Sequence, residues 1–494
     1  MAGLDRREFL AAAAGGVVAS SIPLDLAAGQ GGSRLSRRAA RALRSDVRGR
    51  VLFPGGRGYN SARLIYNLRY DGARPAAVVQ PRDPRDVAAV VNWANRFDVR
   101  VVPRAGGHSY AGYSTTGRGV VLDLSGWRGI RVANGRATVG AGAQLIDMYA
   151  ALARRGLIVP GGSCPSVGVT GLALGGGHGL SGRRFGLTSD NLLRATIVTA
   201  DGRTRQVSPD TNESLYWACR GGGGGNFGIV TSMTFQAHRA KGAAWFFISW
   251  PWGAASEAFA AWQRLAPHAP AGLTSIFSLS TGGSGPPRAT ALGQFFGSEA
   301  ALRRLIRPLT RVGGASLSTG RASMMALALR WAGCLDETFR ACHTRGTSPG
   351  GQLPRSAFYA KSDYFHRPLP PRARRAMIDW VERRGSGALL FDAYGGAYNR
   401  PAADATAFPH RDMLFSLQIF AAGSGRTPRA WANGVWRALR PFASGQAYVN
   451  YIDPELRGWQ RAYYASNLGR LREVKRTYDP DFKFRFAQAI PPAG

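Results

Sequence analysis

The spacing of hydrophobic residues between positions 76 and 110 changes twice. Two short hydrophobic runs, "AAVVQ" and "VRVVP", flank a stretch in which Val87, Val90 and Val91 recur at helical spacing. These three side chains share one face of an α-helix, and Asp83 can cap its first turn. The pattern predicts a strand, a helix, a second strand and then a glycine-rich loop.

Similar patterns continue to about residue 239. The segments "GVVLDLSG" and "RATVGAG" have the alternation of strands, and "AQLIDMYAALARRG" has the pattern of a helix that ends at Gly156. The segment "ATIVTADGRTRQVS" predicts a hairpin about Asp201 and Gly202, because Asp-Gly is a favoured two-residue turn. This part of the chain therefore predicts an α+β domain.

The pattern changes between residues 240 and 440. Strand-like pieces rich in aromatic residues ("AAWFFISW", "ATALGQFF", "ALLFDAYGGA", "MLFSLQIF") alternate with helical pieces such as "ASEAFAAWQRLAP". This order predicts a second, antiparallel sheet with helices on one of its faces. Residues 441–494 form another distinct piece, in which "AYVNYIDPE" precedes an amphipathic stretch.

Positive charge is the strongest bias of the composition. The 494 residues include 64 Lys and Arg against 29 Asp and Glu, which gives a formal net charge of +35. Such an excess is compatible with a nucleic-acid partner, an anionic surface or an acidic substrate. The arginines are spread along the whole chain, however, and no nucleic-acid-binding motif accompanies them. We therefore expect no nucleic-acid partner.

The first thirty residues have the features of a targeting segment rather than of a fold. Arg6 and Arg7 precede a run of small and apolar residues that is too short and interrupted for an ordinary membrane span. This arrangement resembles a twin-arginine export signal, with a frayed N-terminal helix as the alternative. We expect a signal peptide at 1–30, a basic linker at 31–50, no membrane span, and a secreted or extracytoplasmic protein.

The four cysteines do not fit a metal site. Their spacing matches no zinc motif, and the seven histidines form no ligand cluster beside them. We therefore expect no bound metal. Cys334 and Cys342 could close a short disulfide in an oxidising compartment, or they could be two buried thiols.

Three glycine-rich segments carry the strongest functional signal: "RAGGHSYAGYSTTG" at 104–117, "GGSCPSVGVTGLALGGGHGLSG" at 161–182, and "RGGGGGNFGIVT" at 220–231. The second contains a G-x-G-x-x-G match, but no βαβ unit with the expected acidic residue surrounds it, which excludes a Rossmann nicotinamide site. So many glycines in separate loops predict backbone N–H groups that converge on an anionic ligand such as a pyrophosphate.

These segments, together with "YVNYIDPE" and "YYASNLGRLREVKRTYDP" near the C-terminus, resemble the berberine-bridge-enzyme-like branch of the vanillyl-alcohol-oxidase-type FAD proteins. The resemblance covers nearly all of the mature chain, in the family's order and spacing. It implies a two-part PCMH-type FAD-binding domain formed by residues 51–239 and 441–494. Residues 240–440 would form an inserted substrate domain that covers the flavin.

The resemblance also implies how FAD is held. In this family the histidine of G-G-H is bonded to the flavin 8α carbon and the cysteine of G-x-C-x-x-V-G-V to carbon 6; here these are His108 and Cys164. An imidazole nitrogen and a thiolate are nucleophiles suited to an electron-poor ring system. A loop histidine and a small buried thiol are the alternatives. Tyr110 would share the face of His108 in an extended segment and lie above the flavin.

Further residues are assigned to the FAD pocket by the same resemblance. Val167 would lie beside the flavin carbon that reacts with dioxygen, where a valine is typical of the oxidases. The tail departs from the family pattern at Ala465, where a glycine is common, which puts the expected flavin contact of Asn467 in doubt. The other residues assigned to the pocket are Arg104, Ala105, Gly106, Gly107, Ser109, Gly168, Gly171, Asp190, Asn191, Asn226, Ile229 and Tyr464.

The family draws its substrate base from Y-x-N-Y, which makes Tyr448 the first choice here and Tyr451 the second. A tyrosine ionises near pH ~10, so it needs a cation, hydrogen-bond donors or the oxidised flavin nearby to act as a base. Gln418, in "FSLQIF", matches a polar active-site position of the substrate domain, with an ordinary solvated strand residue as the alternative. Tyr110 completes the expected catalytic set.

The resemblance implies a secreted FAD-dependent oxidase that removes a hydride from a carbon bearing a hydroxyl and passes the electrons to dioxygen, forming H2O2. A carbohydrate, above all an oligosaccharide oxidised at its anomeric carbon, is the favoured substrate. A tailoring oxidase of an aromatic or polyketide-like metabolite is the main alternative. A basic binding protein with a structural flavin and a nucleic-acid binder are the other two. The sequence leaves the oligomeric state open.

Overall fold

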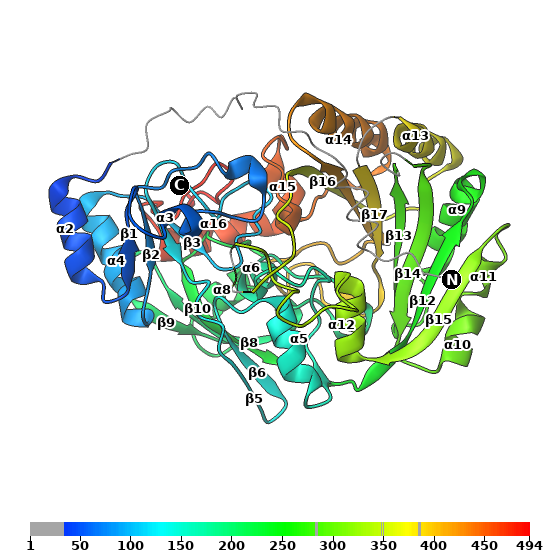
Figure 1. Ribbon diagram of the computed structural model, residues 1–494, viewed down its shortest axis with the longest axis horizontal. Coiled ribbons are helices and arrows are strands. Elements are labelled where there is room, and N and C mark those ends of the chain that lie inside the picture. The colour runs from blue at the N-terminus through cyan, green and yellow to red at the C-terminus, as the bar shows by residue number, and fades with distance from the viewer. Residues whose placement is uncertain (1–33, 282–284, 347, 349, 384–386) are drawn as a thin grey trace.

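The computed structural model describes residues 34–494, apart from residues 282–284, 347, 349 and 384–386. Figure 1 shows two halves, each built around its own sheets, with the C-terminal segment lying beside the N-terminal half. Helices and strands are mixed throughout, which confirms the predicted α+β class. The expected signal peptide at 1–30 lies outside the described residues.

The first sheet contains the strand, helix and strand predicted around residues 76–104. Its order is β1 (Arg50–Leu52), β2 (Ala77–Gln80), β4 (Val120–Asp123) and β3 (Val101–Arg104), with β2, β4 and β3 parallel. Helix α4 (Pro84–Phe97) connects β2 to β3, and the Asp83 side chain caps it by accepting a hydrogen bond from the N–H of Arg85. Strand β3 leads directly into the first glycine-rich segment.

Residues 37–46, expected within a basic linker, form helix α2 (Arg37–Asp46) instead. Ala39 and Leu43 are buried, and the Trp93 indole of α4 donates a hydrogen bond to the Ala39 carbonyl at 2.9 Å. The expectation of a linker is therefore wrong in this range. The basic residues of α2 are exposed, while its two buried apolar side chains pack it against α4.

The second sheet has the order β5 (Ile130–Ala133), β6 (Arg136–Gly140), β10 (Ile229–Gln236), β8 (Leu192–Val198) and β9 (Thr204–Val207). Strands β8 and β9 form the predicted hairpin, and Gly202 in its turn has a φ of +74°. Helix α5 (Leu145–Ala153) ends three residues before the predicted Gly156, which instead occupies the following turn with a φ of +64°.

A seven-stranded antiparallel sheet forms the other half. Its order is β15 (Ser316–Ser323), β12 (Gly242–Trp250), β14 (Arg288–Phe295), β13 (Leu273–Ser280), β17 (Gly387–Ala393), β18 (Phe415–Ala422) and β16 (Phe358–Phe365). The four quoted aromatic-rich segments overlap β12, β14, β17 and β18. Strands β13, β15 and β16 carry more Ser, Thr and charged residues, which hides their alternation.

Helices cover one face of this sheet, as Figure 1 shows on the right of the molecule. Phe391 and Leu417 point into the core beneath these helices, whereas Asp392 and Gln418, one residue further along each strand, line a cavity on the other face. This is the period-two alternation of a strand with two different faces. The covering helices are α9 (Ala255–Leu265), α10 (Glu299–Leu305), α11 (Arg307–Thr310), α13 (Pro371–Glu382) and α14 (Arg426–Leu439).

The chain returns to the N-terminal half at its end. Lys475 of α16 (Leu468–Tyr478) is fully buried and forms an ion pair with Asp479, and the Ile490 N–H donates a hydrogen bond to the Asn226 side chain at 3.0 Å. Other short elements include α3 (Tyr59–Ala62), α6 (Val169–Leu174), α7 (Gly182–Phe185), α8 (Glu213–Ala218), α12 (Met324–Ala332), α15 (Trp459–Tyr464), the 3-10 helix η6 (Val449–Tyr451), and the paired β7 (Leu157–Ile158) and β11 (His238–Arg239).

A strap of residues 333–357 connects α12 to β16. Cys334 and Cys342 form a disulfide within it, which decides the alternative that the sequence left open. His343 in the strap contacts Asp147 of α5 at 2.9 Å, and Leu353 and Pro354 line the cavity. The strap therefore closes one side of the space between the two halves.

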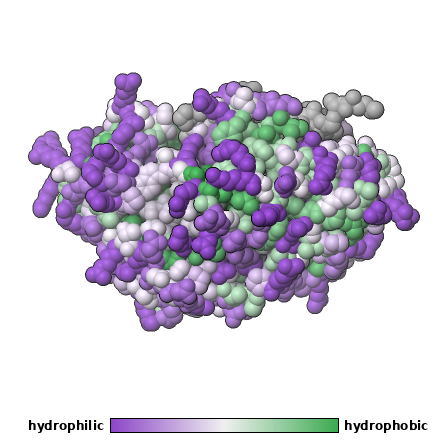
Figure 2. Space-filling model, turned by 90° about the horizontal axis from the view of Figure 1, so that it is seen from below, coloured by the Kyte–Doolittle hydropathy of each residue, from purple (hydrophilic) through white to green (hydrophobic). Residues whose placement is uncertain are grey.

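The surface combines polar and apolar areas. Figure 2 shows hydrophilic side chains scattered over the whole of one face, with smaller hydrophobic areas between them. None of the helices in the described part of the chain is long and apolar enough to cross a membrane.

Candidate functional site

A cavity of about 710 Å³ lies between the glycine-rich segments and the seven-stranded sheet. One wall comes from residues 100–114, 162–180 and 223–230. The opposite wall comes from β13, β17 and β18 and from η6. Residues far apart in the sequence meet here: the side chains of Tyr110 and Gln418, which are 308 residues apart, lie 2.8 Å from each other.

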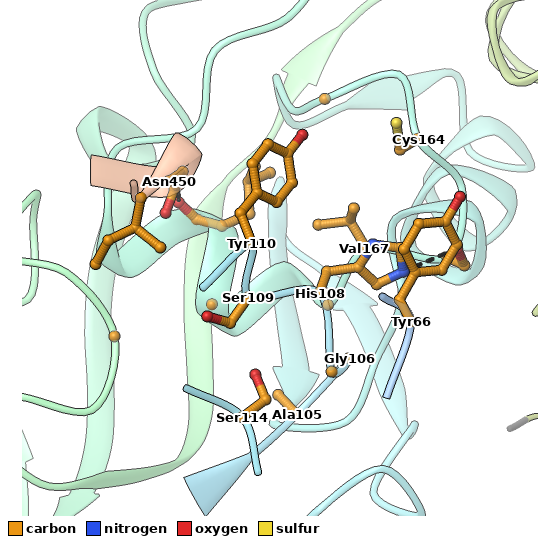
Figure 3. A pocket seen from close by; sticks show the side chains of 18 of the residues that line it. Tyr66, Ala105, Gly106, His108, Ser109, Tyr110, Ser114, Cys164, Val167 and Asn450 are labelled. Atoms are coloured by element: carbon orange, nitrogen blue, oxygen red, sulfur yellow. Dashed lines mark hydrogen bonds between the residues drawn. The ribbon is translucent and has the colours of Figure 1, made fainter. Parts of the chain in front are cut away.

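His108 lines the cavity from the loop that follows β3. Its ring stacks on the ring of Tyr66 at 4.1 Å, and its Nε2 lies 3.0 Å from the Ser166 hydroxyl (Figure 3). Burial lowers the pKa of His108 to about 3, so the imidazole is neutral at physiological pH and one of its ring nitrogens carries a lone pair. Tyr66 is a site residue that the sequence did not single out.

Cys164 is exposed into the same cavity, on the loop between β7 and α6. Helix α5 holds this loop in place by two hydrogen bonds. The Leu145 N–H donates to the Val167 carbonyl, and the Ile146 N–H donates to the Pro165 carbonyl. This contact leaves the thiol and the Val167 side chain on the cavity side. The two predicted nucleophiles therefore line one cavity.

Close approach of two backbones explains the glycines at Gly106 and Gly168. A Cβ on Gly106 would lie 2.3 Å from the Gly168 nitrogen, and a Cβ on Gly168 would lie 2.6 Å from the Gly106 nitrogen. No side chain fits either position without moving the backbone. Gly171 differs: a Cβ there would meet nothing within 4 Å, and this residue faces the cavity.

Aromatic side chains form the opposite end of the cavity. The Gln418 amide donates a hydrogen bond to the Tyr110 hydroxyl at 2.8 Å, and the Tyr110 ring stacks on Tyr451 at 5.3 Å with an angle of 10°. Tyr110 and His108 reach the cavity from the loop that follows β3, which ends at Arg104. Gln418 is only 9% exposed, so it is not a solvated strand residue.

Tyr448 is held more tightly than Tyr451. Its hydroxyl accepts hydrogen bonds from the Gly177 N–H and from the Asn450 amide, both at 2.8 Å, and its side chain is buried. Burial raises the pKa of Tyr448 to about 12, while these two donors lower it. Tyr451 is partly exposed to the cavity, and burial together with the nearby Asp392 carboxylate raises its pKa well above the usual value.

Two further titratable residues next to these tyrosines, one from each wall of the cavity, were not predicted. Asp392 of β17 lies opposite Ile276 in the sheet and lines the cavity. His178 lies in the "GGGHG" part of the second glycine-rich segment, and its Nε2 is 2.9 Å from the Tyr451 hydroxyl. The only sequence signal for His178 was a large side chain between glycines.

Five residues assigned to the FAD pocket lie outside the cavity lining. Arg104 and Asp123 form a buried ion pair at 2.9 Å, and the Arg104 guanidinium also donates to main-chain carbonyls of the loop that begins at α3. Asp190 pairs with Arg411 at 2.6 Å. These side chains fix the loops that surround the cavity, since their charges are already paired.

The other three are Asn191, Ile229 and Asn467. Asn191 donates to the Leu187 carbonyl at 2.8 Å, and Asn467 donates to the Ala403 carbonyl at 2.7 Å. Ile229 is the first residue of β10 and is fully buried in the core beside α4. The remaining assigned residues line the cavity: Ala105, Gly106, Gly107, His108, Ser109, Cys164, Val167, Gly168, Gly171, Asn226 and Tyr464, as do Tyr110, Gln418, Tyr448 and Tyr451.

Two protein-family models match this chain. The model of an FAD binding domain matches residues 75–208, and the model described as berberine and berberine like matches residues 447–491. The FAD-linked oxidoreductase YgaK of Bacillus subtilis (strain 168) is 35% identical over 463 residues, which cover 91% of this chain and 98% of the relative.

Solved structures agree with these matches. BBE-like 1 of Physcomitrella patens has a TM-score of 0.85 and 32% identity, over 92% of this chain and 99% of its own. The chain belongs to the berberine-bridge-enzyme-like FAD-linked oxidoreductases. A xylooligosaccharide oxidase from Myceliophthora thermophila, solved in complex with xylobiose, has a TM-score of 0.82 and 28% identity, over 92% of this chain and 99% of its own. The recognition of the family from its sequence motifs is confirmed.

The cavity fits the FAD that this family binds. Three buried polar atoms of its lining, Arg100 Nε, Tyr113 Oη and Thr170 Oγ1, have no hydrogen-bond partner among the described residues, so they are available to a ligand. The backbone of the first glycine-rich segment lines the cavity beside them. In the described part of the chain, no cluster of three or more His, Cys, Asp or Glu could hold a metal ion.

Proposed function

We propose that this FAD-linked oxidoreductase oxidises a hydroxyl-bearing carbon of a carbohydrate, with an oligosaccharide as the substrate class and dioxygen as the electron acceptor. The observation that carries the proposal is a single cavity that has two nucleophiles, His108 and Cys164, near one wall and a group of phenols at the other. The likeness to a xylooligosaccharide oxidase supports the substrate class. Aromatic faces such as Tyr110 and Phe358 suit the C–H faces of sugar rings.

FAD, when bound, supplies an acceptor for the hydride that leaves the substrate carbon. The protein must then remove the hydroxyl proton, because a hydride leaves readily only as negative charge develops on the oxygen. A base within about 3 Å of that hydroxyl is required. The partial exposure of Tyr451 to the cavity supports this residue as the base. The burial of Tyr448 supports a structural role for it, although the two hydrogen bonds that its hydroxyl accepts lower its pKa. This ranking reverses the preference from the sequence.

Gln418 and Tyr110 position this base in the proposal. The amide of Gln418 fixes the Tyr110 hydroxyl, and the Tyr110 ring then holds the Tyr451 ring by stacking. A base that is held in one orientation loses no entropy when the substrate arrives. The hydroxyl of Tyr110 retains its own proton and can donate it to a sugar oxygen.

Covalent attachment of FAD through both His108 and Cys164 is part of the proposal. The neutral His108 imidazole and the exposed Cys164 thiol support it. Acid-precipitated, denatured protein is expected to remain yellow, and His108→Ala and Cys164→Ala are each expected to keep the flavin through the remaining bond. The double variant should release it. Release of all flavin from the denatured wild type would contradict attachment.

The use of dioxygen is supported by the small side chain of Val167 on the cavity wall. We expect one H2O2 for each substrate oxidised, measured by a coupled peroxidase assay, and rapid reoxidation of reduced protein by air. Val167→Leu should slow reoxidation while leaving the anaerobic rate of flavin reduction unchanged. Reoxidation over many minutes in the wild type would point to another acceptor.

Export through a twin-arginine signal at residues 1–30 and the division into an FAD-binding part (to 239 and from 441) and a substrate part (240–440) complete the proposal. Replacement of Arg6 and Arg7 by lysine should retain folded, flavin-containing protein inside the cell. If this variant is exported as efficiently as the wild type, the signal assignment is wrong.

A further inference from the structure

His178 lies at the centre of the phenol group, although it belongs to the glycine-rich wall. It follows α6, is 5% exposed and lines the cavity. Its Nε2 is 2.9 Å from the Tyr451 hydroxyl and its Nδ1 is 3.3 Å from the Tyr394 hydroxyl. Both ring nitrogens are therefore engaged with phenols, and each of the two neutral tautomers satisfies both contacts; in one of them Tyr451 donates to Nε2 while Nδ1–H donates to Tyr394.

The groups that face this imidazole come from two segments, the one around η6 and the one at the end of β17. Tyr448 and Tyr451 reach it from η6 at ring distances of 4.7 and 5.5 Å, and Tyr394 reaches it from the end of β17. Asp392 of β17 supplies the nearby carboxylate. Burial lowers the pKa of His178, whereas the Asp392 carboxylate raises it. The imidazole is thus neutral at rest and has an anion close by that favours its protonated form.

Tyr451 needs such a neighbour if it acts as the base. Burial and the Asp392 carboxylate both disfavour its phenolate, so an isolated Tyr451 would rarely be ionised at physiological pH. A proton acceptor that is hydrogen-bonded to the Tyr451 hydroxyl would favour the phenolate, because the phenol can transfer its proton to that acceptor as the substrate approaches. The only ring nitrogen in the described part of the chain that contacts the Tyr451 hydroxyl is His178 Nε2.

We propose that His178 accepts the phenolic proton of Tyr451 at Nε2 and thereby makes Tyr451 a base at neutral pH. The Tyr451 O–H bond breaks, an Nε2–H bond forms, and the imidazolium is stabilised by the Asp392 carboxylate. The phenolate then takes the proton of the substrate hydroxyl as the carbon gives up its hydride to the cofactor. This inference rests on the proposed function, and His178 acts through Tyr451 rather than on the substrate.

The first test is His178→Gln, which keeps a hydrogen-bonding side chain but cannot accept a proton. We expect anaerobic flavin reduction by a substrate oligosaccharide to slow by roughly 10²–10⁴-fold, with little change in the substrate concentration at half-maximal rate. In the variant, the reduction rate should rise about tenfold per pH unit above pH ~7, since Tyr451 must then ionise into solvent. The wild type should show a nearly flat profile over this range.

His238→Gln is the matched control, because His238 is half-buried, lies beside Phe185 and is not part of the cavity lining. It should leave the rate and the pH profile unchanged. A His178→Gln rate within about threefold of wild type, with the same pH profile, would overturn the proposal. If the wild type is reduced by no carbohydrate, the proposed function itself fails, which is a separate outcome.

A second measurement does not depend on turnover. In protein with 15N-labelled histidine, the resonances missing from His178→Gln identify His178, and we expect Nδ1 to carry the proton while Nε2 is a hydrogen-bond acceptor. Tyr451→Phe should shift the Nε2 resonance and leave Nδ1 nearly unchanged. A proton on Nε2 in the wild type at neutral pH would overturn the proposal, even if a His178 variant proved unstable.

Discussion

The two walls of the cavity are built in different ways. The glycine-rich wall presents main chain: Gly106 and Gly168 meet at distances that exclude any side chain, and the nucleophiles project from the loops around them. The phenol wall presents side chains from β17, β18 and η6, held by hydrogen bonds and ring stacking. The first wall offers main-chain groups to a ligand, and the second offers titratable side chains.

This difference predicts two kinds of failure. A substitution in the phenol wall removes one functional group while the surrounding core stays intact, so it should change rate more than stability. A substitution in the glycine-rich wall moves backbone, so it should change flavin content and stability together. The strap contacts both halves, so a substitution in it should change stability more than rate.

Tyr451→Phe should have the largest effect on rate. The change removes one oxygen and keeps the ring that stacks on Tyr110, so flavin content and melting temperature should remain close to wild type. We expect flavin reduction to slow by roughly 10²–10⁴-fold in anaerobic stopped-flow measurements, the range of general-base catalysis. Tyr448→Phe should slow it much less. If Tyr448→Phe shows the larger loss, the preference drawn from the sequence was right and the ranking here is wrong.

Cys334→Ser should affect stability more than rate. Loss of the disulfide frees the strap, and native disulfides commonly contribute about 2–4 kcal/mol to the free energy of unfolding. A fall in melting temperature is expected, together with faster proteolysis within residues 333–357. The matched control is Cys219→Ser, a change to a buried thiol outside any disulfide, which should leave the proteolysis pattern unchanged. Equal strap cleavage in wild type and Cys334→Ser would show that the disulfide does not tie the strap.

Gly106→Ala tests the backbone wall with the smallest possible change. Its Cβ would lie 2.3 Å from the Gly168 nitrogen, so the two loops must separate, at a cost of about 1–3 kcal/mol typical of overpacking. We expect lower flavin content per protein, measured by absorbance after purification. Gly117→Ala serves as the control, because its Cβ would meet nothing within 4 Å. Full flavin content in Gly106→Ala would mean that the close approach is not required.

Sequence reasoning succeeded where neighbouring residues carry the information. The strand, helix and strand around α4 follow from local periodicity and the Asp83 cap, and the glycine-rich segments predicted loops that line the cavity. It failed where residues meet across the fold. Asp392 and His178 come from different halves, and nothing near either in the sequence indicates the other.

Charged residues misled the prediction for a related reason. Asp190 and Arg104 lie near the glycine motifs in the sequence, but both are paired with another charged residue. Asp190 forms an ion pair with Arg411, which lies far along the chain, and Arg104 forms one with Asp123 on the neighbouring strand. The basic stretch at 31–50 contains an amphipathic helix. Only two of its residues, Ala39 and Leu43, are buried. In these cases the role of a residue depends on its ion-pair or packing partner, and the tertiary fold determines which residue that partner is.

The most direct test of the central claim is anaerobic mixing of the purified flavoprotein with a panel of xylo-, cello- and chitooligosaccharides and of phenolic alcohols. The account predicts that at least one oligosaccharide bleaches the flavin absorbance within seconds, that a lactone or aldonic acid forms, and that air then restores the colour with one equivalent of H2O2. Bleaching by phenolic alcohols alone, with every oligosaccharide inert, would contradict it and favour oxidation of an aromatic metabolite.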